Sequence, residues 1–153
     1  NYYDDLISLN NILRKFGLHF GYRVIDEISL FYKNAVESQN KGIIRFESDN
    51  QIIDYAVLMK VLPKIHGNRA KVETALYWIL VWASDPKKCE EKQKEFQGEL
   101  GKVRNEFLDV MGKETEVLLN KVQTTESIKY PKTAEKVARM LFQLYSTGFT
   151  SYL

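Results

Sequence analysis

Gly21, Tyr22 and Arg23 stand at the start of a segment whose apolar residues recur with the spacing of a helix. A guanidinium group at the entrance of a helix can form bidentate hydrogen bonds with a terminal phosphate. The same spacing also allows a simpler interpretation, in which Arg23 is a surface residue paired with Glu27 one turn further on. The residues by themselves leave both interpretations open.

A second polar group lies between residues 60 and 69, where basic side chains flank a predicted corner between two helices: Lys60, Lys64, His66 and Arg69. These side chains could contact phosphate, a neighbouring subunit or nucleic acid. Alternatively, they are solvated lysines and a half-buried histidine at a capped corner. For the corner itself, Gly67 is predicted to be a left-handed cap and Asn68 the N-cap of the next helix.

The sequence lacks the motifs of a self-sufficient enzyme. The nearest approach to the phosphate loop G-x-x-x-x-G-K-[ST] is Gly112–Lys113, with Glu114 where serine or threonine is required and Phe107 in place of the first glycine. The two histidines, His19 and His66, have no second ligand at metal-binding spacing. We therefore expect no catalysis and no metal site in this chain alone.

Apolar residues at spacings of three and four predict an all-α helical bundle. The predicted helices cover residues 4–16, 23–38, 52–62, 72–84 and 131–147. The helix at 72–84 has the broadest apolar surface and is expected to be the most deeply buried. Its aromatic residues Tyr77, Trp78 and Trp82 are predicted to be core residues rather than a stacking platform.

The segment 87–123 is rich in lysine, glutamate and glutamine, with a narrow apolar seam. It is predicted to be one long helix, or two helices with a turn near Gly112, followed by a polar loop at 124–127. Cys89 lies among charged residues at the start of this segment and is expected to be a solvated thiol. The alternating tail 149–153 is expected to pair as a short strand.

Composition sets limits on the class of protein. The 153 residues suit one domain, and a net charge of +2 is too small to indicate a surface for nucleic acid or membrane. The single cysteine excludes an intramolecular disulfide and fits a reducing cytoplasm. No stretch approaches the roughly 20 apolar residues that cross a bilayer. Because the chain opens on asparagine rather than methionine, we expect it to be a fragment of a longer protein.

Four stretches occur in an order that resembles the C-terminal region of McrB-like AAA+ NTPases, the motors of modification-dependent restriction systems. They are FGYRVIDEI (20–28), KVLPKIHGNR (60–69), YPKTAEKVARML (130–141) and GFTSY (148–152). The resemblance implies the small helical subdomain that closes as a lid over a nucleotide. In one helical domain, residues 1–86 would be the lid-like core, 87–128 a helical insertion, and 129–153 the C-terminal helix and tail.

The resemblance also implies roles for the two polar groups. Arg23 would be the sensor-2 arginine that reaches the terminal phosphates, Gly21 would allow close approach of the backbone, and Tyr22 would lie near the base or the hinge. The basic corner (Lys60, Lys64, His66 and Arg69) would face phosphate or the adjacent subunit of a ring.

The implied cofactor is GTP or ATP with Mg²⁺ in the parent protein, and this fragment alone would bind none. The implied partners are the AAA+ core of the same protein, neighbouring subunits in a hexamer, a McrC-like nuclease, and DNA through the parent complex. The implied role is anti-phage defence in the cytoplasm. The resemblance does not distinguish GTP from ATP.

Two functions of other classes stay open. The chain could be a free-standing nucleic-acid-binding module, in which Lys132, Lys136 and Arg139 contact phosphates and the tail forms a wing. The near-neutral net charge argues against this function, because such domains usually carry a basic excess. The chain could also be a protein-interaction adaptor that uses the apolar seam of residues 87–123.

Overall fold

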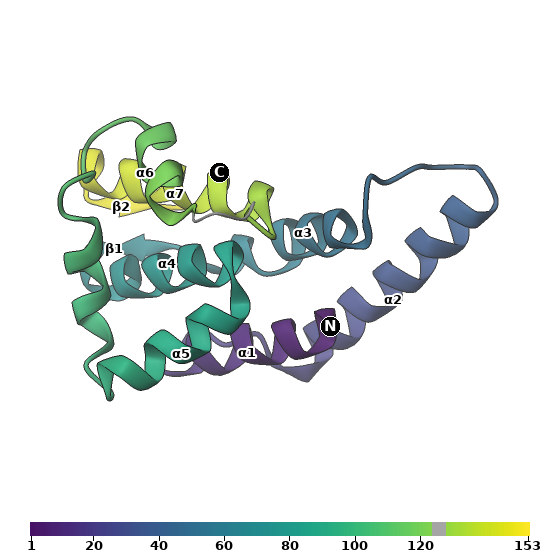
Figure 1. Cartoon of the computed structure of the whole chain (residues 1–153), viewed down its shortest axis with the longest axis horizontal. Coiled ribbons are helices and arrows are strands. Elements are labelled where there is room, and N and C mark those ends of the chain that lie inside the picture. The colour runs from purple at the N-terminus through teal and green to yellow at the C-terminus, as the bar shows by residue number, and fades with distance from the viewer. Residues whose placement is uncertain (124–127) are drawn as a thin grey trace.

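The computed structural model of the chain describes residues 1–123 and 128–153, and it is an all-α bundle with one small sheet (Figure 1). The predicted loop at 124–127 lies outside the described residues. The elements are α1 (Tyr2–Arg14), α2 (Gly21–Asn40), α3 (Asp49–Lys60), η1 (Leu62–Lys64), β1 (Gly67–Asn68), α4 (Arg69–Ser84), α5 (Pro86–Phe96), η2 (Leu100–Phe107), α6 (Thr115–Val122), α7 (Pro131–Thr147) and β2 (Phe149–Thr150), where η denotes a 3₁₀ helix. The all-α prediction is confirmed.

Helix α4 is the centre of the bundle. It packs against α7, α5, η2 and α1, and its residues from Ala75 to Ala83 are all buried. A helix that is apolar on every side can be stable only when other elements surround it. The prediction that this helix is the most deeply buried, with its aromatic residues in the core, is therefore confirmed.

The two tryptophans of α4 connect it to distant parts of the chain. The indole nitrogen of Trp82 donates to the carbonyl of Asp5 in α1 at 2.9 Å, and its ring stacks on Tyr130 with 4.8 Å between centroids. The indole nitrogen of Trp78 donates to the carbonyl of Leu100 at 3.0 Å. Each indole is fully buried with its one donor satisfied, so both rings add apolar burial without an unpaired polar group.

The segment after α4 differs from the prediction of one long helix or a helical pair. It forms three short helices, α5, η2 and α6. The first break falls at Gln97 and Gly98, which have φ angles of 47° and 88°, and the expected turn at Gly112 has a φ of 77°. Left-handed backbone at two consecutive residues ends a helix, and the sequence pattern did not reveal this first break.

The apolar seam of this segment is part of the main core rather than a separate layer. The buried side chains along it are Leu100, Val103, Phe107, Val110, Leu118 and Val122. Both η2 and α6 contact α4, and α6 also contacts α7. The seam is therefore covered by this chain itself.

Cys89 is buried, so the prediction of a solvated thiol is wrong. Its side chain has 0% exposure, and Sγ lies 4.0 Å from the carbonyl oxygen of Trp78. The charged neighbours in sequence point outward, while Cys89 faces α4 on the inner side of α5. Burial raises the pKa of this thiol to about 12.

We expect Cys89 to be protected from thiol reagents in the folded chain. Reaction with 5,5′-dithiobis(2-nitrobenzoate) at pH 8 should be slower by about 10²-fold or more than in the same chain unfolded in urea, because it must wait for local opening. Absorbance at 412 nm measures the rate. An equal rate in the two conditions would contradict the burial of this thiol.

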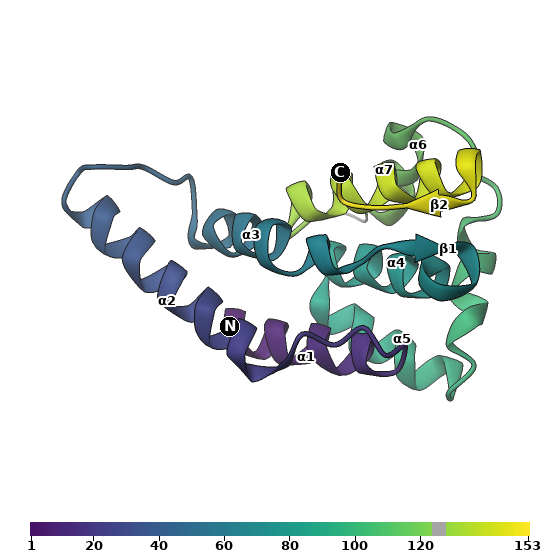
Figure 2. The same cartoon turned by 180° about the vertical axis from the view of Figure 1, so that it is seen from behind.

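The C-terminal tail pairs with the corner between α3 and α4 (Figure 2). In this antiparallel sheet Gly67 pairs with Thr150 and Asn68 with Phe149, which confirms the predicted short strand. Asn68 caps α4 as predicted by accepting from the amide of Lys71 at 3.1 Å. Gly67 is not a left-handed cap, because it has a φ of 142° and belongs to β1. The pairing holds the corner against the end of α7.

Helix α2 extends away from the bundle, and the loop 41–48 returns the chain to α3 (Figure 1). Val24, Ile25 and Ile28 anchor its first turns, and Ala35 is buried further along the helix. Large apolar side chains remain exposed both on the helix, at Leu30, and on the loop, at Ile43 and Ile44. In the described part of the chain, no helix combines the length and apolar character required to span a membrane.

Candidate functional site

The turn that leads into α2 is fixed by a buried side chain of α1. Asn10, which is 2% exposed, accepts hydrogen bonds through Oδ1 from the amide of Phe20 at 2.8 Å and from that of Gly21 at 3.2 Å. Gly21 has a φ of 71°, and no atom lies within 4 Å of the position that a Cβ would take. The turn therefore requires glycine for its backbone conformation rather than for lack of space.

Two large side chains project from this fixed turn into solvent. Tyr22 is 64% exposed, and Arg23 is also exposed. Among the described residues, Arg23 has no ion-pair partner within 4.0 Å. The next two residues, Val24 and Ile25, are buried and anchor the first turn of the helix. The backbone is thus held firmly while the hydroxyphenyl and guanidinium groups stay free for an external ligand.

The alternative pairing of Arg23 with Glu27 is wrong. Glu27 faces Lys60 at the end of α3 instead, with 3.9 Å between the charged atoms. This ion pair is exposed and contributes little to stability. Its geometric meaning is clear, however, since it places the end of α3 beside the second turn of α2.

The basic corner is not one cluster. Lys60 turns toward α2, whereas Arg69 donates to Glu73 at 2.8 Å and lies over the ring of Tyr145 at 4.5 Å. Lys64 and His66 are exposed between them, so His66 is not half-buried. The four predicted residues therefore serve at least two different surfaces.

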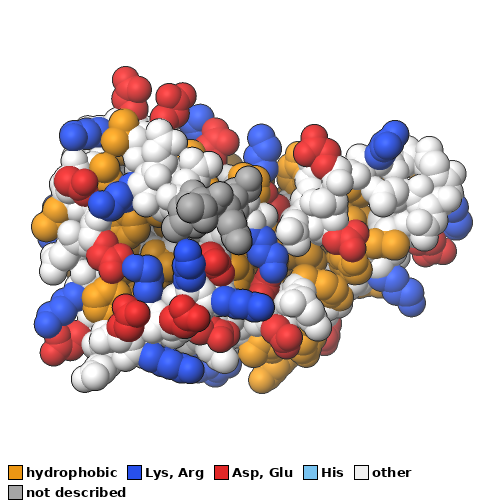
Figure 3. Space-filling view, viewed as in Figure 1, with side chains coloured by type: hydrophobic (Ala, Val, Ile, Leu, Met, Phe, Trp, Pro, Cys, Tyr) orange, Lys and Arg blue, Asp and Glu red, His pale blue; other side chains and the backbone are white. Residues whose placement is uncertain are grey.

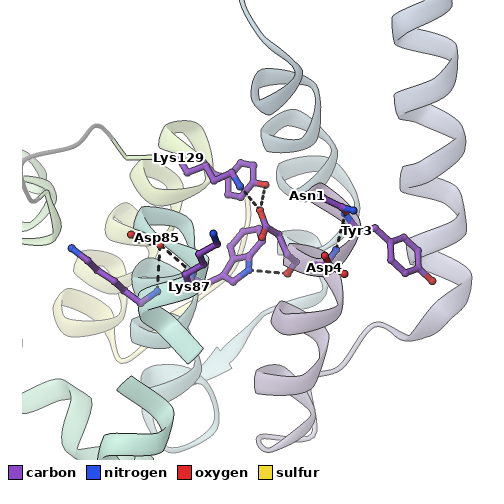
Figure 4. Close-up of polar contacts among 10 residues, drawn as sticks. Asn1, Tyr3, Asp4, Asp85, Lys87 and Lys129 are labelled. Atoms are coloured by element: carbon purple, nitrogen blue, oxygen red, sulfur yellow. Dashed lines mark hydrogen bonds and ion pairs between the residues drawn. The ribbon is translucent and has the colours of Figure 1, made fainter. Parts of the chain in front are cut away.

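A polar cleft of about 510 Å³ lies where α1, α3, α5 and α7 begin. Figure 4 shows polar contacts beside this cleft, with Asn1, Asp85, Lys87 and Lys129 labelled. Asn1 caps α1 by accepting from the amide of Tyr3 at 2.8 Å, and Asp85 caps α5 by accepting from Lys87 at 3.1 Å. The caps occupy helix ends that would otherwise attract an anion.

The two buried carboxylates beside the cleft also have structural partners. Asp54 accepts from the amides of Lys132 and Thr133, both at 2.8 Å, and so caps α7. Burial raises the pKa of Asp54, although these amide hydrogen bonds favour its charged form. Asp5 accepts from Lys129 at 2.7 Å and from the hydroxyl of Tyr130 at 2.6 Å. Both carboxylates connect helices rather than face a reactant.

The basic residues of α7 are largely engaged by the chain itself. Lys136 lies over the ring of Tyr152 at 4.8 Å, and Arg139 pairs with Glu135 at 2.9 Å. On the face seen in Figure 3, positive and negative side chains are interspersed rather than gathered by sign. The arrangement gives little support to α7 as a helix that follows a phosphate backbone.

Sequence reasoning missed Asn10 and the group of residues around Arg69. Asn10 was detectable as a polar residue inside the apolar stripe of the first helix. The group of Glu73, Arg104 and Tyr145 around Arg69 was not, because it joins three elements distant in sequence. In the described part of the chain, no cluster of three or more histidine, cysteine, aspartate or glutamate side chains could hold a metal ion.

Comparison with known proteins gives one match. A family model described as "Domain of unknown function (DUF8727)" matches residues 1–149. No curated protein and no solved structure matches the chain.

Proposed function

This chain belongs to the DUF8727 family, and from this premise we propose that it is the lid region of a AAA+ NTP-driven motor in a McrBC-like DNA restriction system. The observation that carries the proposal is the exposed Tyr22–Arg23 pair on a turn fixed by Asn10. A sensing arginine requires a rigid backbone and a free guanidinium group, and both occur here. The ordered resemblance of four stretches supports the same function.

In this function Arg23 supplies charge rather than chemistry. Its guanidinium group would donate hydrogen bonds to the terminal phosphates of GTP or ATP, whose charge Mg²⁺ also offsets, and would stabilise the negative charge that develops during phosphoryl transfer. Tyr22, on the same turn, would contact the base or the hinge. Gly21 would let the backbone approach the nucleotide.

The proposal requires partners. A P-loop domain of the same protein would provide the floor of the nucleotide site, and neighbouring subunits would complete a ring. The exposed basic residues Lys60, Lys64 and His66 would face a neighbouring subunit. A McrC-like nuclease and DNA would bind the assembled motor, which would work in the cytoplasm.

The genomic reading frame provides a direct test. A frame that continues upstream of Asn1 into a domain with G-x-x-x-x-G-K-[ST] supports a lid. An initiating methionine immediately before Asn1 would overturn the proposal, because the chain would then lack a phosphate loop.

We also expect the 153-residue chain to bind GTP and ATP only feebly, because an arginine on an exposed turn buries little of a nucleotide. Isothermal titration calorimetry with Mg²⁺ present should detect no binding at micromolar concentrations. A dissociation constant of about 1 μM would contradict the lid function and would indicate a complete nucleotide site within this chain.

A further inference from the structure

Two arginine side chains meet one carboxylate near the beginning of α4. Oε2 of Glu73 lies 2.8 Å from Nε of Arg69 and 3.5 Å from Nε of Arg104. The hydroxyl of Tyr145 donates to the same oxygen. The Glu73 side chain is 16% exposed, whereas those of Arg69 and Arg104 are 49% and 38% exposed. One largely buried carboxylate therefore holds two guanidinium groups beside each other at the surface.

The charges of this group do not balance. Two guanidinium cations share one carboxylate, and within the described residues neither arginine has a second acidic partner within 4.0 Å. Arginine remains charged at every physiological pH, so the excess positive charge cannot be removed by losing a proton. An anion that binds here would compensate it.

The contacts of the two arginine side chains also determine their orientation. Arg69 is oriented by stacking over Tyr145 at 4.5 Å. Nε of Arg104 is shielded from solvent and faces Oε2 of Glu73 at 3.5 Å, without the geometry of a hydrogen bond. Both guanidinium groups are therefore held toward the same carboxylate, which fixes their positions before a ligand binds.

We propose that Arg69 and Arg104 form a binding site for a phosphate group. The planar donors of two guanidinium groups match the oxygens of phosphate, and the ligand would compensate the excess charge of the group. The site rests on residues other than Arg23 and stands whether or not the chain is a lid. The phosphate could be free or part of a nucleic acid backbone, since the contacts would be the same.

The test is an NMR titration of the ¹⁵N-labelled chain, which follows the Nε–Hε signals of Arg69 and Arg104. Sodium phosphate is added while sodium chloride is reduced to keep the ionic strength constant. We expect saturable shifts of both signals, with a dissociation constant on the order of 1 mM, as for two charge-assisted hydrogen bonds at an exposed site. Arg104→Gln should weaken binding at least tenfold, and Arg104→Lys by less.

Arg139 is the matched control, because it pairs with the single carboxylate of Glu135 at 2.9 Å and is 62% exposed. Arg139→Gln should leave phosphate binding unchanged. A second titration with a 12-base-pair DNA duplex distinguishes the sources. Duplex binding that Arg104→Gln abolishes and Arg139→Gln spares assigns the phosphate to nucleic acid, whereas saturation by free phosphate alone assigns it to a small anion. The site would be overturned if the shifts fail to saturate in both titrations. It would also be overturned if the Arg139 signal shifts as much as those of Arg69 and Arg104 in both.

Discussion

Replacing Arg23 by alanine is expected, under the proposed lid function, to lower NTP turnover of the full-length protein by about 10²-fold, which is the cost of removing one charged donor from a phosphoryl-transfer site. The fold should not change, because the Arg23 side chain is exposed and has no ion-pair partner among the described residues. Steady-state phosphate release at saturating Mg²⁺-GTP and Mg²⁺-ATP measures the effect. The effect should fall mainly on kcat, since in the proposed lid function the arginine would act on charge that develops in the transition state.

Two variants make this result specific. Arg23→Lys keeps the charge but loses the planar pair of donors, and is expected to recover only part of the activity. Arg45→Ala removes another exposed arginine, from the loop 41–48, and should leave turnover unchanged. Unchanged turnover in Arg23→Ala would mean that Arg23 does not sense phosphate, and an equal loss in Arg45→Ala would indicate a general effect of charge.

Replacing Trp82 by alanine should lower the free energy of unfolding by about 3–5 kcal/mol, the usual cost of removing a large aromatic side chain from a core. The indole is fully buried, stacks on Tyr130, and donates to the carbonyl of Asp5. The substitution therefore leaves a cavity beside Tyr130 and removes the indole hydrogen bond to α1. Urea denaturation followed by far-ultraviolet circular dichroism measures the change.

Trp82→Phe separates the two contributions, because phenylalanine fills much of the space and keeps an aromatic ring but lacks the donor. It should cost less than alanine but more than an exposed substitution. Tyr22→Ala, at a side chain that is 64% exposed, should change stability by about 0.5 kcal/mol or less. A loss below about 1 kcal/mol in Trp82→Ala would contradict the central position of this ring in the core.

Much of the helical framework could be predicted from sequence, because the recurrence of apolar residues at spacings of three and four depends only on the local geometry of a helix. The broad apolar surface around Trp78 and Trp82 could belong only to a surrounded helix, which α4 is. Asn68 was recognisable as a cap because it bonds to a residue three positions away. The exposed turn at Gly21–Arg23 was also predictable as a helix entrance.

The surroundings of individual side chains were decided by the tertiary structure. Cys89 has charged neighbours in sequence, but α5 lies on α4 with this residue inward. One of the two interpretations of Arg23 paired it with Glu27, yet α3 brings Lys60 to Glu27 and leaves Arg23 without that partner. Burial and pairing depend on which distant segment covers a face, and a local pattern contains no information about that choice.

The same reason separates the two proposed sites. Arg23 was a candidate from sequence because its turn, helix entrance and exposure follow from neighbouring residues. The pair of Arg69 and Arg104 could not be found, because 34 residues lie between them in the chain and only the packing of η2 on α4 brings Arg104 to Glu73, one helical turn from Arg69. The sequence determined most of the helices and the entrance of α2, and the tertiary structure decided which charges meet.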